Sequence, residues 1–368
     1  MARRAPTIPP MRTGTTVAVG TTKGLFLFGA GGVEGPFFKG ERVPSVALDA
    51  RREPTRILAG TVNEVWGAGV RTSDDGARTW TDPAERPLKF PADSGAALAQ
   101  VWQLQAGGAE DPDTFYAGVE PAALFRSDDR GESWSLIRGL WDHPHRTEWL
   151  PGFGGLGLHT VLLDPRDAER ITIAISAGGV YRSDDGGDTW IARNVGVARA
   201  PQRDYAEFGQ CVHKVARDAI DPDRLFMQNH GGLYRSDDNG DTWQDVANGV
   251  PSDFGFPIVA HPHAGDTAYV IPLESAEYRA TPEARCRVYR TTDAGASWLP
   301  LTGGLPQQDA HLAVLRDAFC HDGLDPLGLY FGTRTGEVYE STDEGESWEL
   351  LIEHLPPVLC VRAAPIEL

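Results

Sequence analysis

The sequence is poor in cysteine and lacks long apolar runs. Its four cysteines, Cys211, Cys286, Cys320 and Cys360, are widely spaced and form no CxxC pair, which argues against a zinc ribbon or a disulfide framework. No stretch approaches the ~18 apolar residues of a membrane-spanning helix, and the start "MARRAPTIPPMRTGTT" lacks the apolar core of a signal peptide. We therefore expect reduced thiols in a soluble, cytoplasmic protein.

Positive charge is also scarce. Lys and Arg total 34 against 52 Asp and Glu, which gives a formal net charge of -18. Such a chain repels phosphate backbones and anionic lipid surfaces, because affinity for these polyanions depends on clustered Lys and Arg. We therefore predict no nucleic-acid partner and no membrane partner.

One short phrase recurs along the chain. The pattern S/T-x-D-x-G-x-S/T-W appears as "SDDRGESW", "SDDGGDTW", "SDDNGDTW", "TTDAGASW" and "STDEGESW", and a sixth copy, "SDDGARTW", has its glycine one place early. The copies begin at positions 73, 127, 183, 236, 291 and 341, so successive copies are 50 to 56 residues apart. A period near fifty residues is typical of a solenoid or a β-propeller.

The residues around the phrase favour the propeller. A short apolar strand such as "GGVYR" or "GGLYR" precedes each phrase, and another such as "RITIAI" or "RLFMQ" comes before it, bounded by turns such as "IDPDR". Four short strands per unit with almost no helical periodicity are typical of a propeller blade. We label these strands A, the innermost, to D, the outermost.

The two ends of the chain supply a seventh blade. The N-terminal "TVAVGTTKGLFLFGAGG" resembles strands B and C without a preceding A strand, and the C-terminal "PPVLCVRAAP" resembles a lone A strand. Pairing them closes the ring and removes open sheet edges. We therefore predict an all-β fold: a tail over residues 1–14, then a single seven-bladed β-propeller over 15–368, closed by pairing of the C-terminal strand with the N-terminal strands.

The repeated phrase resembles the Asp-box, or BNR repeat. This repeat occurs in sialidases, in xyloglucan-cleaving glycoside hydrolases, in the sortilin ectodomain and in a class of photosystem II assembly factors. The resemblance extends from about Thr15 to Pro365 and implies the propeller fold. It implies no single activity, because these families share little function.

The phrase itself is expected to serve the fold. A short carboxylate in the turn between strands C and D accepts backbone N–H groups, the glycine permits a positive φ, and the Trp packs between sheets. A role repeated in every blade is structural, because a catalytic site needs only one copy. The structural carboxylates are Asp75, Asp129, Asp185, Asp238, Asp293 and Asp343.

A ligand site is expected on the opposite, top face, which carries the D-to-A and B-to-C connections. The D-to-A connections 138–159 and 194–213 and the B-to-C insertion 273–286 are long and rich in Trp, His, Tyr and Glu. Long loops are costly to order unless they frame something. The residues predicted to bind a ligand there are Asn63, Glu64, Trp102, His159, His213, Asn229, His230, His311 and Arg334.

Three hypotheses compete for this pocket. His159, His213 and His311, aligned at the starts of A strands, could hold one divalent metal with Glu120 as an oxygen ligand. Glu120 with Glu207 or Glu274 could form the acid and base pair that glycoside hydrolysis requires. A module that binds without chemistry needs neither.

We predict a binding module as the principal function. Its pocket at the top of the central channel would recognise a small polar or carbohydrate-like ligand, or a protein partner. The alternative is a glycoside hydrolase or related carbohydrate-active enzyme. A true sialidase is disfavoured, because the Arg-Ile-Pro motif of those enzymes is absent. The pocket is expected to be formed by Trp102, Glu120, His159, His213, His230 and His311.

Overall fold

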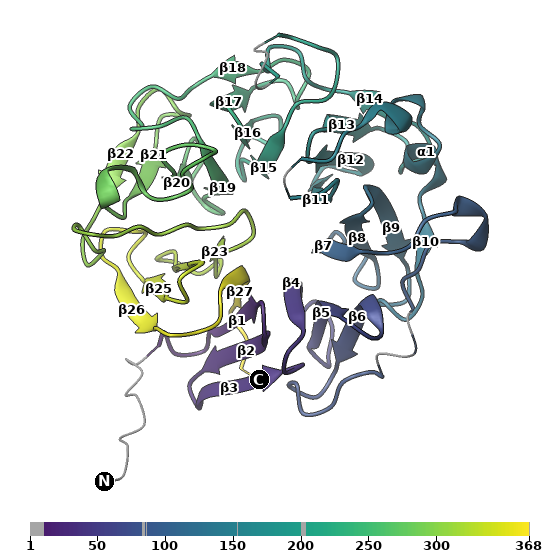
Figure 1. The fold of residues 1–368 in the computed structure, drawn as a ribbon, viewed down its shortest axis with the longest axis horizontal. Helices are drawn as coiled ribbons and strands as arrows, with labels where there is room; N and C mark the ends of the chain where they lie inside the picture. Colours follow the sequence, from purple (N-terminus) through teal and green to yellow (C-terminus); the bar gives the residue numbers. More distant parts are fainter. Residues whose placement is uncertain (1–10, 83–84, 86, 153, 200–203, 368) are drawn as a thin grey trace.

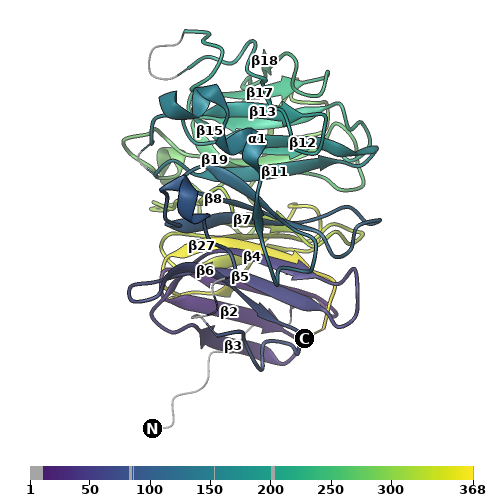
Figure 2. The same ribbon diagram turned by 90° about the vertical axis from the view of Figure 1, so that its right-hand side faces the viewer.

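Seven small sheets are arranged around a central axis, as the sequence predicts (Figure 1). The computed structural model describes residues 11–82, 85, 87–152, 154–199 and 204–367, so most of the predicted tail lies outside the described residues. Seen edge-on, the ring is a flattened disc (Figure 2). Within the described part of the chain, no helix is both long enough and apolar enough to span a membrane.

The first three blades follow the chain order, apart from the innermost strand of blade one. Blade one contains, from the inside outward, β27 (Val358–Ala364), β1 (Thr16–Thr21), β2 (Gly24–Gly29) and β3 (Gly32–Phe37). Blade two contains β4 (Arg42–Asp49), β5 (Arg56–Asn63) and β6 (Gly67–Ser73). Blade three contains β7 (Gln100–Ala106), β8 (Phe115–Glu120), β9 (Ala123–Ser127) and β10 (Ser135–Leu136).

The other four blades each have four antiparallel strands. Blade four contains β11 (Leu158–Asp164), β12 (Asp167–Ile175), β13 (Gly179–Ser183) and β14 (Ile191–Ala192). Blade five contains β15 (Val212–Arg217), β16 (Leu225–Asn229), β17 (Gly232–Ser236) and β18 (Gln244–Asp245). Blade six contains β19 (Gly255–Ala260), β20 (Ala268–Pro272), β21 (Val288–Thr291) and β22 (Leu299–Leu301). Blade seven contains β23 (Phe319–His321), β24 (Leu329–Gly332), β25 (Val338–Ser341) and β26 (Glu349–Ile352).

Helix is confined to connections between strands. The helix α1 (Arg138–Trp141) and the 3-10 turn η2 (Pro144–Glu148) lie in the long connection from blade three to blade four. Two further 3-10 turns, η1 (Ala92–Ser94) and η3 (Pro282–Ala284), lie in the connection after blade two and in the insertion of blade six. All four lie in D-to-A or B-to-C connections, the set of connections for which the sequence predicts a ligand site.

The ring closes as predicted, by pairing of its two ends. Strand β27 runs antiparallel to β1, with Val19 opposite Val361 and Ala18 opposite Arg362. Because β27 takes the innermost place in blade one, every blade has an inner strand beside the axis. Closure therefore joins residues about 340 positions apart in the sequence without leaving a free inner sheet edge.

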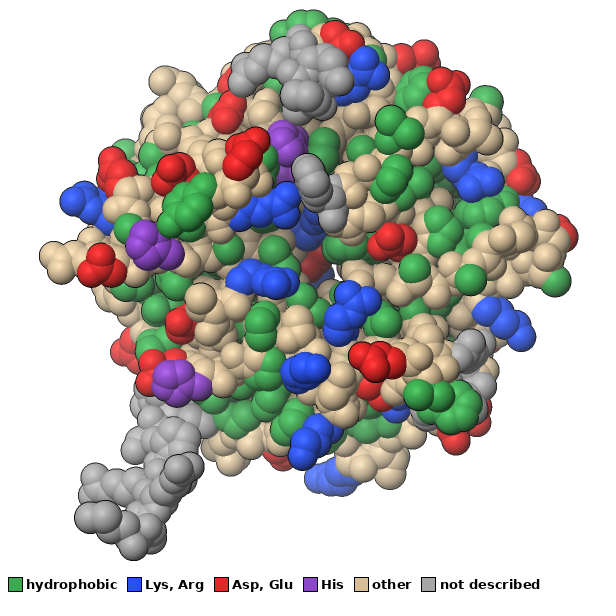
Figure 3. All heavy atoms as spheres, in the orientation of Figure 1, with side chains coloured by type: hydrophobic (Ala, Val, Ile, Leu, Met, Phe, Trp, Pro, Cys, Tyr) green, Lys and Arg blue, Asp and Glu red, His purple; other side chains and the backbone are tan. Residues whose placement is uncertain are grey.

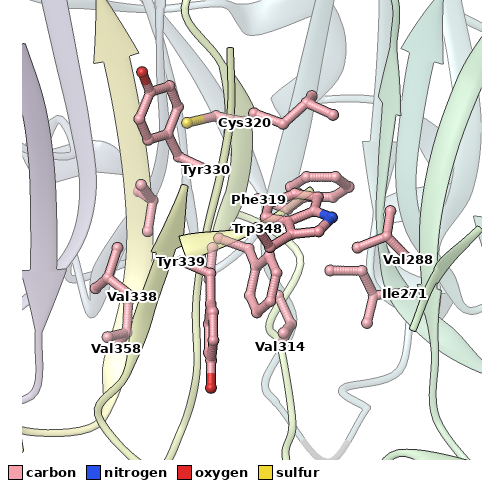
Figure 4. Packing of buried hydrophobic residues seen from close by; sticks show 14 of the residues in the cluster. Ile271, Val288, Val314, Phe319, Cys320, Tyr330, Val338, Tyr339, Trp348 and Val358 are labelled. Atoms are coloured by element: carbon pink, nitrogen blue, oxygen red, sulfur yellow. The ribbon is translucent and has the colours of Figure 1, made fainter. Parts of the chain in front are cut away.

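Apolar side chains fill the space between neighbouring blades. Figure 4 shows Ile271 and Val288 of blade six facing Phe319 and Trp348 of blade seven. All four side chains are buried. Burial of such aliphatic and aromatic groups contributes about 1.5–3 kcal/mol per side chain, so the blade interfaces hold the disc together.

The repeated phrase forms the same turn in each of its six copies. In blade four, the Ser183 hydroxyl donates to Asp185 Oδ1 (2.8 Å) and accepts the Gly187 N–H (2.8 Å). Asp185 also accepts the amide and the hydroxyl of Thr189, at 2.9 and 2.6 Å. The other five carboxylates, Asp75, Asp129, Asp238, Asp293 and Asp343, make the equivalent bonds. These carboxylates are therefore engaged by their own turns.

Candidate functional site

Two groups of polar side chains lie in or beside the first two strands of blades three, five and seven. The first, the Trp102 group, consists of Trp102, Glu120 and Arg316. The second, the His213 group, consists of Cys211, His213 and His230. Four of the six residues predicted to form one pocket are therefore divided between two places, and each place must be judged by its own contacts.

The members of the Trp102 group are held together by a hydrogen bond and a cation–π contact. Trp102 Nε1 donates to Glu120 Oε2 (3.0 Å), and the Arg316 guanidinium lies 4.9 Å from the Trp102 ring centre. A Cβ at Gly155 would lie 2.2 Å from Glu120 Oε1, and one at Gly157 would lie 2.3 Å from Trp102 Nε1. The glycines thus let the loop after blade three approach the Trp102–Glu120 pair closely, and both side chains remain half-buried.

Arg316 connects this group to the axis. Its Nη1 donates to the Ser176 hydroxyl at 3.0 Å. Burial lowers the pKa of the guanidinium, while the neighbouring charge of Asp317 opposes that shift. Arg316 also acts electrostatically on His213. Arg316 therefore interacts with members of both groups.

A second set of charged residues lies next to Arg316: Lys214 of β15, Arg362 of β27 and Asp317, which precedes β23. Asp317 Oδ1 accepts from Lys214 Nζ (2.8 Å) and from Arg362 Nη2 (2.7 Å). Asp317 is buried, and its Oδ2 has no hydrogen-bond partner among the described residues. Two cations therefore share one carboxylate beside the axis, although the chain as a whole is acidic. Figure 3 shows one face of the disc, on which Lys and Arg side chains gather around the centre.

The His213 group is compact and mostly buried. Cys211 Sγ lies 3.8 Å from His213 Nε2, and the ligand atoms of all three residues lie within 4.8 Å of one another. The His213 Nδ1–H donates to Gly255 O (2.5 Å). Burial lowers the pKa of His213 well below its usual value and also lowers the pKa of His230. Both imidazoles are therefore neutral at pH 7.

A cavity of about 280 Å³ adjoins this group between blades five and six. Its lining includes Asp253, from the connection between these blades. It also includes Glu274 and Glu277, from the blade-six insertion. Glu274 and Glu277 are exposed and make no ion pair with a described residue. The full lining is Ala198, Arg199, His230, Gly231, Asp253, Phe254, Glu274, Ser275, Ala276 and Glu277.

The cavity is more acidic than its residue list suggests. The Arg199 guanidinium is held by Asp204, with Nη2–Oδ2 at 2.6 Å and Nε–Oδ1 at 2.9 Å. Its charge is therefore largely neutralised. The carboxylates of Glu274 and Glu277 remain as acceptors for a ligand that donates hydrogen bonds.

Several predicted residues have other partners. His159 is fully buried, with Nε2 2.9 Å from Val212 O and Nδ1 3.1 Å from Thr160 Oγ1, so it joins blades four and five. Asn63 accepts the amides of Val65 and Trp66 within its own turn. These bonds occupy both side chains locally.

Other predicted residues lie outside the cavity lining. Glu64, Glu207 and Arg334 are exposed. The side-chain amide of Asn229 donates to Ala198 O (3.2 Å), which places it beside the cavity. Of the three carboxylates proposed for catalysis, Glu120, Glu207 and Glu274, only Glu274 lines the cavity.

The predicted metal trio is not assembled. Among the described residues, Cys211, His213 and His230 are the one group of three or more potential ligands within 4.8 Å of one another. His311 instead lies exposed on the loop before β23, with Nδ1 2.8 Å from the Tyr278 hydroxyl. The assumption that His311 begins an inner strand was wrong, because that strand starts only at Phe319.

The residue of blade seven that corresponds to His213 is found by counting back from the aspartate that follows each inner strand. Asp218 and Asp322 end the inner strands of blades five and seven and accept amides of the following turn. His213 lies five residues before Asp218, and Asp317 lies five before Asp322. The equivalent of His213 is therefore Asp317. Sequence reasoning also missed Arg316, Asp253 and Glu277, for which the chain offers no repeated pattern.

Comparison with known proteins finds sequence similarity to xyloglucanases. No known protein-family profile matches it. It is 26% identical over 227 residues to a xyloglucanase of a Paenibacillus species and 21% identical over 262 residues to the xyloglucanase Xgh74A of Acetivibrio thermocellus. These matches cover 54% and 64% of this chain, but only 21% and 30% of the two relatives. The chain thus spans less than a third of the length of these relatives.

Solved structures share the fold at low sequence identity. An ancestral GH74 enzyme superposes with a TM-score of 0.57 at 16% identity, over 85% of this chain and 39% of its own. YCF48 bound to D1 peptide gives 0.52 at 14%, over 94% and 88%. A protein from Lactobacillus plantarum gives 0.57 at 13%, over 95% and 98%. At such identities the likeness establishes the fold alone.

Proposed function

Because the chain is a seven-bladed β-propeller with the fold of GH74 enzymes and of YCF48, we propose that it binds a small carbohydrate-like ligand in the cavity between blades five and six. One observation carries the proposal: Glu274 and Glu277 line this cavity and form no ion pair with any residue that the structure describes. Unpaired carboxylates at a concave surface are strong acceptors for ligand hydroxyl groups.

The size and charge of the cavity restrict the ligand. At about 280 Å³ it lies at the lower end of ligand cavities, which span roughly 300–1,000 Å³. It therefore suits a small molecule or the end of a longer one. An anionic ligand is disfavoured by Asp253, Glu274 and Glu277, whereas neutral polyols donate hydrogen bonds to carboxylates without charge repulsion. The names of the sequence relatives select xyloglucan oligosaccharides as the probe.

Calorimetric titration with a xyloglucan oligosaccharide tests the proposal. Glu274→Gln is expected to weaken binding about 10- to 100-fold, because a hydrogen bond to a charged group contributes about 1.5–3 kcal/mol. Glu64→Gln is the matched control, since Glu64 is an exposed carboxylate on the same face but outside the cavity. No binding by the unmodified protein, or equal weakening by both variants, would reject this site.

Glycoside hydrolysis is the second candidate, and it rests on the same cavity. Such hydrolysis requires two carboxyl groups, one to protonate the leaving oxygen and one to act as base or nucleophile. Asp253, Glu274 and Glu277 bring more than one carboxyl group to a single cavity. Release of reducing ends from xyloglucan, lost in both Glu274→Gln and Glu277→Gln, would establish an enzyme. Binding without release would leave a binding protein.

A further inference from the structure

We propose that Cys211, His213 and His230 bind one Zn²⁺ ion beside the cavity, with a fourth coordination position left for a small ligand. The site would take a thiolate and two imidazoles, which are common zinc ligands in proteins. It differs from the trio expected from the sequence and shares only His213 with it. The inference does not depend on what the cavity binds.

The spacing of the ligand atoms suits a tetrahedral ion. Zn–S bonds of about 2.3 Å and Zn–N bonds of about 2.0–2.1 Å place tetrahedral sulfur and nitrogen ligands about 3.6 Å apart. Cys211 Sγ and His213 Nε2 are 3.8 Å apart, and the third ligand atom lies within 4.8 Å of both. Because tetrahedral nitrogen ligands of zinc lie about 3.4 Å apart, the His230 ring would have to move inward by at most about 1.4 Å to complete the set.

The three ligands come together because of strand pairing. Val212 of β15 is the register partner of Asn229 of β16. Cys211 and His213 flank Val212, and His230 follows Asn229. The His230 amide also donates to Cys211 O (2.9 Å), which fixes the two backbone segments together. All three side chains therefore belong to one rigid sheet corner and not to separate loops.

His213 is already oriented as a ligand. Its Nδ1–H donates to the Gly255 carbonyl, so Nε2 carries the free lone pair and faces Cys211. A backbone carbonyl in this position is the usual means by which a protein fixes the tautomer and direction of a ligating histidine. The rings of Phe254 and Phe256 pack against His213 at centroid distances of 5.4 and 4.7 Å, which restricts its rotation.

The surroundings also provide for a fourth ligand. His230 belongs both to the group and to the cavity lining, so the ion would lie at the cavity wall. Three protein ligands with one open position are typical of zinc sites that take water or substrate. Beside His230, the Asn229 Oδ1 atom is buried without a donor among the described residues.

Nearby charges act in both directions. Arg316 and Arg279 both act on Cys211 and His213 and disfavour a cation. The thiolate supplied by Cys211 offsets one positive charge. Arg279 acts on His230 as well, but Glu277 and Asp253 act on it with the opposite sign. We therefore expect a site that holds zinc through thiolate and imidazole bonds and does not select cations by charge alone.

Cobalt titration tests the site directly. The purified protein is stripped with a chelator and titrated with Co²⁺, whose thiolate complexes absorb in the near ultraviolet. We expect one equivalent to give this charge-transfer band and Zn²⁺ to displace it. Cys211→Ser should abolish the band. His230→Gln should weaken Co²⁺ binding at least tenfold, with thermal unfolding unchanged in both variants.

The controls separate a true site from incidental binding. His311→Gln removes an exposed histidine outside the group and should leave the titration unchanged. His213→Ala is less informative, since it also breaks the bond between blades five and six. Absence of a thiolate band in the unmodified protein, or a band that survives Cys211→Ser, would overturn the proposal.

Discussion

The Ser and Asp side chains of the repeated turn act as a pair. In blade five, Ser236 Oγ donates to Asp238 Oδ1 and accepts the Gly240 amide, both at 2.8 Å. Asp238 in turn accepts the amide and hydroxyl of Thr242, at 2.8 and 2.6 Å. The two side chains thus satisfy turn amides that have no strand partner, which explains why the phrase needs both.

These bonds make stability depend on pH. Hydrogen bonds from the Thr79 hydroxyl and amide lower the pKa of Asp75 to about 2. The pKa values of the other five turn carboxylates are lowered as well. Burial opposes the shift in all five and is the largest single effect in Asp129, Asp238 and Asp343, where the hydrogen bonds of the turn outweigh it together. Because the folded pKa lies below the unfolded value, the stabilisation is complete above about pH 4 and is lost as pH falls towards 2.

We therefore predict that the thermal midpoint falls steeply between pH 4 and pH 2. Asp75→Asn should lower the midpoint at pH 7 and reduce the slope of this fall, since Asn cannot be protonated in this range. Calorimetric scans across the pH series give both quantities. An unchanged slope in the variant would mean that the acid transition has another origin, such as the Asp164–Arg166 ion pair.

At the scale of elements, ring closure depends on how closely β1 approaches its neighbours. Gly20 faces Cys360 in the register of β1 and β27. A Cβ at Gly20 would lie 2.2 Å from Val43 O of blade two and 2.5 Å from Cys360 Sγ. A backbone oxygen cannot yield as a flexible side chain can, so this contact requires glycine.

Gly20→Ala should therefore weaken closure. Overpacking of this kind costs about 1–3 kcal/mol, seen as a lower midpoint of denaturant unfolding. Gly29→Ala is the matched control, because Gly29 also lies in blade one and its Cβ would approach nothing nearer than Thr16 Oγ1 at 4.0 Å. Equal loss in both variants would show that closure is not the cause.

The sequence was sufficient for the blades but not for every strand. Periodic phrases and strand patterns predict seven blades and the closure, because each blade repeats one local solution to the same folding problem. Blade two differs from the other blades, and its phrase differs as well. The glycine of its phrase comes one place early, so Ala77 takes the positive φ of 67°, and its sheet has only three strands. The position of His311 was missed because the segment before β23 is irregular and carries no alternating pattern.

The candidate site was only partly predictable for a similar reason. His213 and His230 follow from aligned strand ends, because strand register places them. Glu277, Arg316 and Asp253 lie in connections whose paths depend on packing between blades, which no local pattern encodes. Sequence reasoning therefore placed His213 and His230 near one another, but it did not foresee the hydrogen bond from Trp102 to Glu120 or the close approach of Gly155 and Gly157.

For the whole molecule, the net charge is negative, but positive charges are in local excess beside the axis. The chain carries a formal charge of -18, yet Lys214 and Arg362 share the buried Asp317 beside the axis, and Arg316 lies next to it. Loss of one partner from a buried ion pair leaves an uncompensated charge and costs about 3–5 kcal/mol. This cluster joins blades five, seven and one, so its effect extends across the ring.

Asp317→Asn is expected to destabilise the protein by about 3 kcal/mol, a value near the lower limit for buried pairs because Lys214 and Arg362 are partly exposed. Urea unfolding measures the loss. Asp113→Asn, which breaks the exposed pair with Arg52, should cost less than about 1 kcal/mol. Similar losses in the two variants would contradict a special role for the axial cluster.

Hydrogen exchange with mass spectrometry, with and without a xyloglucan oligosaccharide, tests the central claim most directly, because it reports on all seven blades at once. If the ligand binds between blades five and six, exchange slows in the segments that line the cavity: 198–199, 230–231, 253–254 and 274–277. Protection confined to the loop around Trp102, or spread over no particular blade, would contradict the site.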